Sequence, residues 1–170
     1  IDDVTRRPDT VPVDPERVLF LGHSAGGQLA LWAAAAQDLP AGADGAGPRL
    51  VPRAVVALAG VTDLARCADE GLIGVACAQV LGGTPDEVPD RYARTSPQQL
   101  VPLGVPQRLF HGLVDDVVPV DYSRSYLAAA QGAGDDVALA EQADANHFTV
   151  LDPRTTAWRQ VRDTVDQVLG

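Results

Sequence analysis

The 170-residue chain contains no methionine and no lysine, so each of its 13 basic residues is an arginine. Its 23 acidic residues outnumber them and give a formal net charge of −10. Nucleic acids and anionic membrane surfaces bind basic faces, so this charge predicts that neither is a partner. Hydrophobic residues make up 46% of the chain, as expected for a globular domain with its own core.

Long apolar runs are also absent. The best candidate, Leu29 to Ala36, is far shorter than the roughly 20 residues that span a membrane, and no signal peptide opens the chain. These absences predict a cytoplasmic protein. The chain starts at Ile1 rather than at a methionine, and residues 1–4 resemble the end of a helix. We therefore expect a fragment of a longer protein.

Cysteine is scarce, with only Cys67 and Cys77, which excludes a disulfide framework. The pattern predicts a single helix over Leu64–Leu81, on which ten residues would separate the two thiols by about 15 Å. That distance is beyond disulfide reach. No CxxC or CxxH spacing points to zinc. We expect two reduced, half-buried thiols and no metal or organic cofactor.

Short apolar runs, most of them ending in glycine, alternate with longer stretches of helical composition. The expected strands cover residues 18–21, 54–59, 107–111 and 136–140. The expected helices cover residues 25–36, 64–81, 121–131 and 155–169, with short helical turns over 85–103 and a surface loop over 38–52. Asp121 is the expected N-cap of the third helix, and Gly132 is its expected C′ residue, just beyond the end of the helix. This order predicts an α/β fold with a mostly parallel sheet and helices on both faces.

The most informative motif is Gly22-His23-Ser24-Ala25-Gly26, between an expected strand and an expected helix. A nucleophilic serine at such a turn is strained and needs small neighbours, which Gly22 and Gly26 supply. The Ala25 N–H, at the start of the helix, is the expected oxyanion donor. The alternative is a plain glycine-rich turn with a capping serine. A phosphate-binding loop is a poor alternative, because the chain has no lysine and lacks the GxxxxGK[ST] pattern.

A serine nucleophile needs a histidine base and an acid that orients it. Of the three histidines, His147 follows the fourth strand, at the sheet edge where ligands bind in parallel α/β folds. We expect His147 to be the base. His23 is expected to pack beside the turn, and His111 to bind loop carbonyls. Two adjacent carboxylates after the third strand, Asp115 and Asp116, are both placed to be the acid, and this spacing alone does not separate them.

Three motifs together resemble the carboxyl-terminal half of an α/β-hydrolase, from Val18 onward. They are Gly22-His23-Ser24-Ala25-Gly26-Gly27-Gln28-Leu29-Ala30, His111-Gly112-x-x-Asp115-x-x-Val118-Pro119 and Asn146-His147-Phe148. The esterase/lipase and kynurenine-formamidase-like branch is the most similar, and prolyl-oligopeptidase-like domains are near.

The resemblance implies a Ser24–Asp115–His147 triad, and so selects Asp115 over Asp116 as the acid. The expected substrate is a small carboxylic ester or aryl-formamide, contacted by His23 and Val118. The resemblance also implies that the amino-terminal strands of the fold, and the loop with the second oxyanion donor, lie outside this chain.

Two alternatives remain open. Peptidases related to prolyl oligopeptidase often carry an aromatic residue after the elbow serine, where this chain has Ala25. A non-catalytic remnant is the other alternative. Residues 61–102 are expected to form a lid-like insertion that shapes the substrate pocket. The competing interpretation is a surface segment that has no role in the pocket. The oligomeric state is left open.

Overall fold

The computed structural model describes residues 14–35, 50–70 and 74–170. Its sheet has four parallel strands in the order in which they follow along the chain. They are β1 (Leu19–His23), β2 (Ala54–Leu58), β3 (Gln107–Gly112) and β4 (Val137–Gln142). The expected α/β class and the four expected strands are confirmed.

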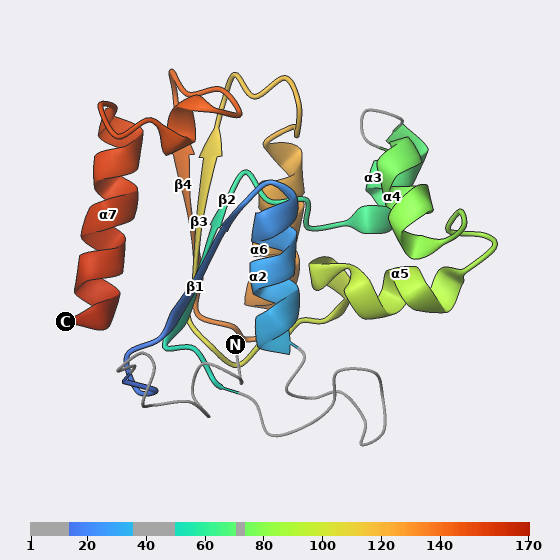
Figure 1. Ribbon diagram of the computed structural model, residues 1–170, viewed down its shortest axis with the longest axis horizontal. Helices are drawn as coiled ribbons and strands as arrows, with labels where there is room; N and C mark the ends of the chain where they lie inside the picture. The colour runs from blue at the N-terminus through green and yellow to red at the C-terminus, as the bar shows by residue number, and fades with distance from the viewer. Residues whose placement is uncertain (1–13, 36–49, 71–73) are drawn as a thin grey trace, which may run out of the picture.

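Helices cover both faces of the sheet (Figure 1). α2 (Ala25–Ala35) and α6 (Asp121–Gly132) lie on one face, and α7 (Thr156–Leu169) lies on the other. Successive side chains of a strand point to opposite faces, so β2, which is buried throughout, contributes to two cores. Val55 packs with the α2 and α6 side chains. Val56 packs with Val161 of α7.

A long connection between β2 and β3 forms a separate helical layer, beyond α2 and α6 on the side away from the sheet (Figure 1). It contains α3 (Leu64–Glu70), α4 (Gly74–Leu81), α5 (Pro89–Thr95) and the 3₁₀ turn η2 (Pro97–Gln99). The expected short turns among the prolines of 85–103 are thus confirmed.

The single helix expected over 64–81 is wrong, because α3 ends at Glu70 and α4 begins at Gly74. The two helices pack against each other. The expected separation of the thiols fails with it: the Sγ atoms of Cys67 and Cys77 lie 3.0 Å apart. Glycines within a weakly apolar pattern were the signal for a break here.

Two other helices differ in how their ends are capped. Thr155 caps α7, its hydroxyl accepting a hydrogen bond from Trp158 N at 3.1 Å. For α6 the prediction is wrong: Val120 is the N-cap and Asp121 is already helical. The left-handed residue after α6 is Gly134, with φ 91°, rather than Gly132.

Two sequence features lie outside the described residues: the helix-like start of the chain and most of the loop expected over 38–52. Among the residues that are described, no helix is both long enough and apolar enough to cross a membrane. Cytoplasmic location stays a prediction.

Candidate active site

A strained turn at Ser24 joins the carboxyl end of β1 to α2. Ser24 has φ 57°, in the left-handed region that side chains rarely adopt, at a cost of about 1–3 kcal/mol. Its N–H donates to the Leu58 carbonyl at 2.8 Å. Its own carbonyl accepts from the N–H groups of Gly27 at 3.0 Å and Gln28 at 3.2 Å. The neighbouring strand and the first turn of α2 therefore hold the serine in this conformation.

Two glycines allow the backbone segments around this turn to approach closely. A Cβ on Gly22 would lie 1.9 Å from the Gly26 carbonyl oxygen, which no side chain tolerates. A Cβ on Gly27 would lie 3.0 Å from Gly60 Cα, at the segment after β2. A Cβ on Gly26 would meet nothing within 4 Å. The expectation that Gly26 must be small is therefore wrong, and Gly27 was missed.

The N–H group that is expected to be an oxyanion donor lies at the start of α2. Ala25 is the first residue of α2 and is exposed. The N–H groups of the first helical turn have no acceptor within the helix and carry the positive end of its dipole. The Ala25 N–H is thus placed to receive a negative charge that develops beside Ser24.

His147 and Asp115 form a buried hydrogen-bonded pair. His147 Nδ1 donates to Asp115 Oδ2 at 2.8 Å, and both side chains are almost fully enclosed, at 3% and 0% exposure. The other carboxylate oxygen accepts from the N–H groups of Val117 at 2.9 Å and Val118 at 2.8 Å. Asp116 is exposed on the surface. Of the two candidate acids, Asp115 is therefore the one that contacts the imidazole.

The loops that carry these two side chains are bound to each other. Leu113 N donates to the Gln142 carbonyl at 2.9 Å, and Val114 N donates to the Ala145 carbonyl at 3.2 Å. A Cβ on Gly112 would lie 2.0 Å from the Ala145 carbonyl oxygen, so only glycine fits at the end of β3. This contact holds the acid and base loops at one edge of the sheet.

His23 connects the loop that carries His147 to the turn at Ser24. Its Nε2–H donates to the His147 carbonyl at 2.7 Å, and the two rings lie 4.5 Å apart between centroids. Burial lowers the pKa of His23. His147 therefore lies against the residue that precedes Ser24. The Ser24 hydroxyl makes no hydrogen bond within the described part of the chain, so the serine–imidazole bond itself is not formed in this structure.

His111 is fully buried and supports the acid loop from below. Its Nε2–H donates to the Val118 carbonyl at 2.8 Å, and its Nδ1 accepts from the Ser123 hydroxyl at 2.7 Å. This confirms the expected contact with a loop carbonyl. Both ring nitrogens are satisfied by the neutral imidazole, and burial lowers the pKa of His111.

Val118 differs from its expected role. Its side chain is only 2% exposed and packs with Val61, Cys67 and Tyr122. A side chain buried in this way offers no surface to a substrate, so the expected contact is wrong. The backbone of Val118 instead holds Asp115 and His111 in place.

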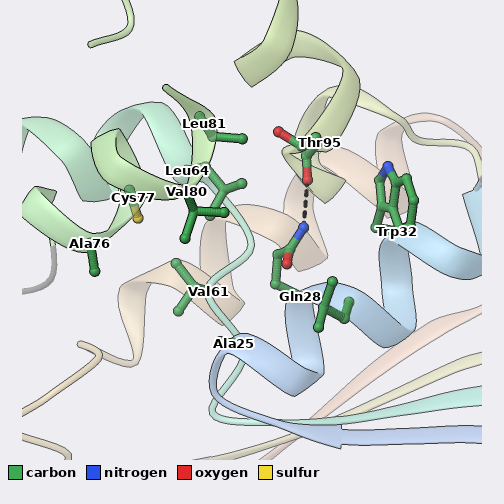
Figure 2. A pocket seen from close by; sticks show the side chains of 11 residues that line it. Ala25, Gln28, Trp32, Val61, Leu64, Ala76, Cys77, Val80, Leu81 and Thr95 are labelled. Atoms are coloured by element: carbon green, nitrogen blue, oxygen red, sulfur yellow. Dashed lines mark hydrogen bonds between the residues drawn. The ribbon is translucent and has the colours of Figure 1, made fainter. Parts of the chain in front are cut away.

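An apolar cavity of about 260 Å³ lies beside Ala25, between α2 and the helical layer (Figure 2). The Gln28 amide donates to the Thr95 carbonyl at 2.8 Å, which ties α2 to the end of α5. One wall comes from the segment expected to shape a pocket. The lining residues are Ala25, Gln28, Leu29, Trp32, Val61, Leu64, Ala76, Cys77, Val80, Leu81 and Thr95. Sequence reasoning pointed to the segment 61–102 as a pocket wall, but it did not identify which of its side chains line the cavity.

In the region that the structure describes, no group of three or more histidine, cysteine, aspartate or glutamate side chains is arranged to hold a metal ion. The candidate site therefore consists of Ser24, the Ala25 N–H, His147 and Asp115, next to an apolar cavity.

Comparison with solved structures shows the fold. An acylaminoacyl peptidase of Pyrococcus horikoshii matches 98% of this chain with a TM-score of 0.78 and 20% identity, and the match covers 26% of that protein. The esterase Est2 of Thermogutta terrifontis matches 98% of the chain, with a TM-score of 0.71, 24% identity and 59% of its own length covered. A truncated carbohydrate esterase from gut microbiota matches 97%, with a TM-score of 0.75, 21% identity and 64% of its length covered.

The chain thus spans about a quarter of the acylaminoacyl peptidase and less than two thirds of these esterases. No curated protein matches significantly. The family model of the prolyl oligopeptidase family matches residues 9–167, nearly the whole chain. The resemblance to α/β-hydrolases is confirmed, and within that superfamily the match falls on the peptidase branch that the motifs had ranked second. The chain belongs to the prolyl oligopeptidase family of α/β-hydrolases.

Proposed function

We propose that this chain is the catalytic part of a serine hydrolase that uses Ser24 as nucleophile, His147 as base and Asp115 as the orienting acid. The observation that carries the proposal is the hydrogen bond between His147 and Asp115. The loops of these two residues lie against the turn in which Ser24 has a left-handed backbone conformation. The family match and the order Ser–Asp–His along the chain support it.

The reaction follows from the positions of the protons. Because His147 Nδ1 donates to Asp115, the Nε2 lone pair is free to accept the Ser24 proton. Ser24 Oγ then attacks the acyl carbon, and the Ala25 N–H stabilises the oxyanion. His147 gives the proton to the leaving group, and water repeats the sequence on the acyl-enzyme. Asp115 stays ionised and holds the imidazole in the required tautomer.

The proposed substrate is a small carboxylic ester or an aryl-formamide. The cavity beside Ala25 supports a small apolar group, because its walls are almost entirely aliphatic and aromatic side chains. A second candidate, cleavage of a peptide by a prolyl-oligopeptidase-like enzyme, is favoured by the family match. Rates on p-nitrophenyl butyrate and on a blocked dipeptide p-nitroanilide compare the two. A kcat/KM at least ten times higher on the anilide would select the peptidase.

A fluorophosphonate probe tests the nucleophile. It should label Ser24, which lies on the tryptic peptide 18–49 as the sole serine of that peptide. Labelling should disappear in Ser24→Ala and persist in Ser125→Ala, a serine of α6 with no part in the site. Persistent labelling of Ser24→Ala, or absence of labelling in the wild type, would overturn the proposal.

The cavity can be tested as the acyl pocket by filling it. Ala76→Phe places a ring in the cavity wall, and we expect it to lower kcat/KM for a hexanoyl ester at least tenfold more than for an acetyl ester. Val75→Phe is the matched control, because Val75 lies on the same helix, is 71% exposed and does not line the cavity. Equal effects of Ala76→Phe on both esters would place the acyl group elsewhere.

A further inference from the structure

The two cysteines of the chain lie close together in the helical layer. Their Sγ atoms are 3.0 Å apart, one on α3 and one on α4. A disulfide bond is about 2.05 Å long, so the sulfur atoms need to approach by only about 1 Å to become bonded. Cys67 is 2% exposed, whereas Cys77 is half-buried and lines the apolar cavity (Figure 2).

We propose that Cys67 and Cys77 are a redox pair that forms a reversible disulfide, and that this bond ties α4 to α3 in the wall of the cavity. The bond needs no activity of Ser24, so the proposal stands apart from the proposed function.

α3 is the fixed partner of the pair, because several contacts hold it to the body of the fold. The Tyr122 hydroxyl donates to Glu70 at 2.9 Å, and the Arg66 guanidinium lies over the Tyr122 ring, 4.2 Å from its centroid. Leu64 N donates to the Ser96 hydroxyl at 3.1 Å. These contacts fix the position of α3 and therefore of the Cys67 thiol.

α4 is attached more loosely. Its Val75 is 71% exposed, and its Val80, which also lines the cavity, is 83% exposed, so two large apolar side chains of this short helix are largely uncovered. In the described part of the chain, α3 is the element against which α4 packs most extensively. A covalent bond between these helices would therefore restrict the wall that carries Ala76, Cys77 and Leu81.

The chemistry assigns different roles to the two thiols. The two thiols lie within hydrogen-bonding distance of each other, and this contact lowers the pKa of Cys77 and raises that of Cys67. Cys77 is also the accessible sulfur, since it borders the cavity. It is therefore the thiolate that attacks an oxidant first.

The oxidant we propose is a low-molecular-weight disulfide, RSSR. The Cys77 thiolate attacks one sulfur of RSSR, forming the mixed disulfide and releasing RS⁻, which takes up a proton. Cys67 then loses its proton and attacks the Cys77 sulfur, releasing the second RS⁻. The two protein thiols lose two electrons and two protons, and RSSR becomes two RSH. Binding of a metal is the weaker interpretation, because no third ligand gathers around the pair within the described residues.

Mass spectrometry tests the pair directly. Trypsin cleaves after Arg66 and Arg91 and leaves both cysteines on one peptide, residues 67–91. The folded protein is treated with hydroxyethyl disulfide or with dithiothreitol, then alkylated with iodoacetamide in denaturant. After oxidation we expect a peptide that has lost two hydrogen atoms and carries no alkyl group. Two alkyl groups after oxidation, or a stable mixed disulfide on Cys77, would overturn the proposal.

Single variants give the order of attack. Cys67→Ser should stop at the mixed disulfide on Cys77, while Cys77→Ser should react at least tenfold more slowly, because its remaining thiol is buried. Equal rates would refute the assigned roles.

Thermal unfolding tests whether the disulfide between α3 and α4 stabilises the protein. Closing a loop of this length should raise Tm by about 5–10 °C over the dithiothreitol-treated protein. Neither single variant should show this rise. An internal disulfide that left Tm unchanged would refute the claim that the bond restrains α4.

Discussion

The Gly22→Ala variant tests the close approach on which the elbow depends. The added Cβ would lie 1.9 Å from the Gly26 carbonyl oxygen and 2.2 Å from its carbon. Both atoms belong to the backbone, so no flexible side chain can move aside. Since real Cβ contacts are essentially never shorter than 3.0 Å, β1 and α2 must separate by about 1.1 Å at this point.

This displacement sets the size of the effect. Overpacking that forces the backbone to move costs about 1–3 kcal/mol or more, and we expect about 3 kcal/mol because neither side can yield. At a urea slope of about 2 kcal/mol/M the midpoint of unfolding falls by about 1.5 M. A shift of about 1 Å next to Ser24, the proposed nucleophile, should lower kcat about 100-fold in the fraction that remains folded.

The matched control is Gly26→Ala, four residues along the same turn. Its Cβ would meet nothing within 4 Å, and the residue lies in the first turn of α2. Alanine favours the helix over glycine by up to about 1 kcal/mol, so we expect this variant to be as stable as the wild type or slightly more stable. Urea unfolding followed by the fluorescence of Trp32 on α2 and Trp158 on α7 reports both faces of the sheet. If the two variants unfold at the same midpoint, the close approach of Gly22 is not what requires glycine there.

Two further predictions concern side chains around the acid. Asp115→Asn should lower turnover about 10⁴-fold and leave the fold intact, because the amide oxygen still accepts from the Val117 and Val118 N–H groups but the NH₂ group cannot accept from the imidazole. Asp116→Asn, at an exposed position, should change turnover less than twofold. Steady-state kinetics that give the reverse ranking would reassign the acid. Burial lowers the pKa of His111 below 6.5, so below about pH 6.5 the unfolded chain binds a proton that the folded chain does not. The contribution of His111 to stability should therefore be constant above about pH 6.5 and should fall by at most about 1.4 kcal/mol per pH unit below it. Between about pH 7.5 and 5.5, the free energy of unfolding in urea should fall less for His111→Gln than for the wild type. If the free energy of unfolding changes with pH equally in the two proteins, His111 is not the source of this pH dependence.

Local patterns were enough to predict the sheet and the elbow. The apolar runs of β1 to β4 are short and mostly bounded by glycine, and strand-turn-helix context around Ser24 reads directly from neighbouring residues. The choice between Asp115 and Asp116 was different. Adjacent carboxylates share every local property, and only the tertiary contact with His147 separates them. The resemblance to a family supplied that information in advance, whereas spacing could not.

Two of the errors share a cause, which is that the decisive contact of the residue comes from another element of the fold. Cys67 and Cys77 looked separated because a continuous helix was assumed, and the packing of α3 on α4 reverses that inference. The family resemblance implied that Val118 contacts the substrate, but Tyr122 and Val61 pack against its side chain. In both cases the pattern was local and the decisive contact was tertiary.

The site is assembled by close contacts between backbones, and glycine marks each of them. Gly22 meets the start of α2, Gly27 meets the segment after β2, and Gly112 meets the Ala145 carbonyl in the base loop. The first contact sets the strained serine, the second packs α2 against β2, and the third binds the acid loop to the base loop. A single sequence shows these glycines but not the backbone that each one faces. The residues of the proposed triad can therefore be found from motifs and a family resemblance, while the contacts that hold their segments together lie in residues with no side chain at all.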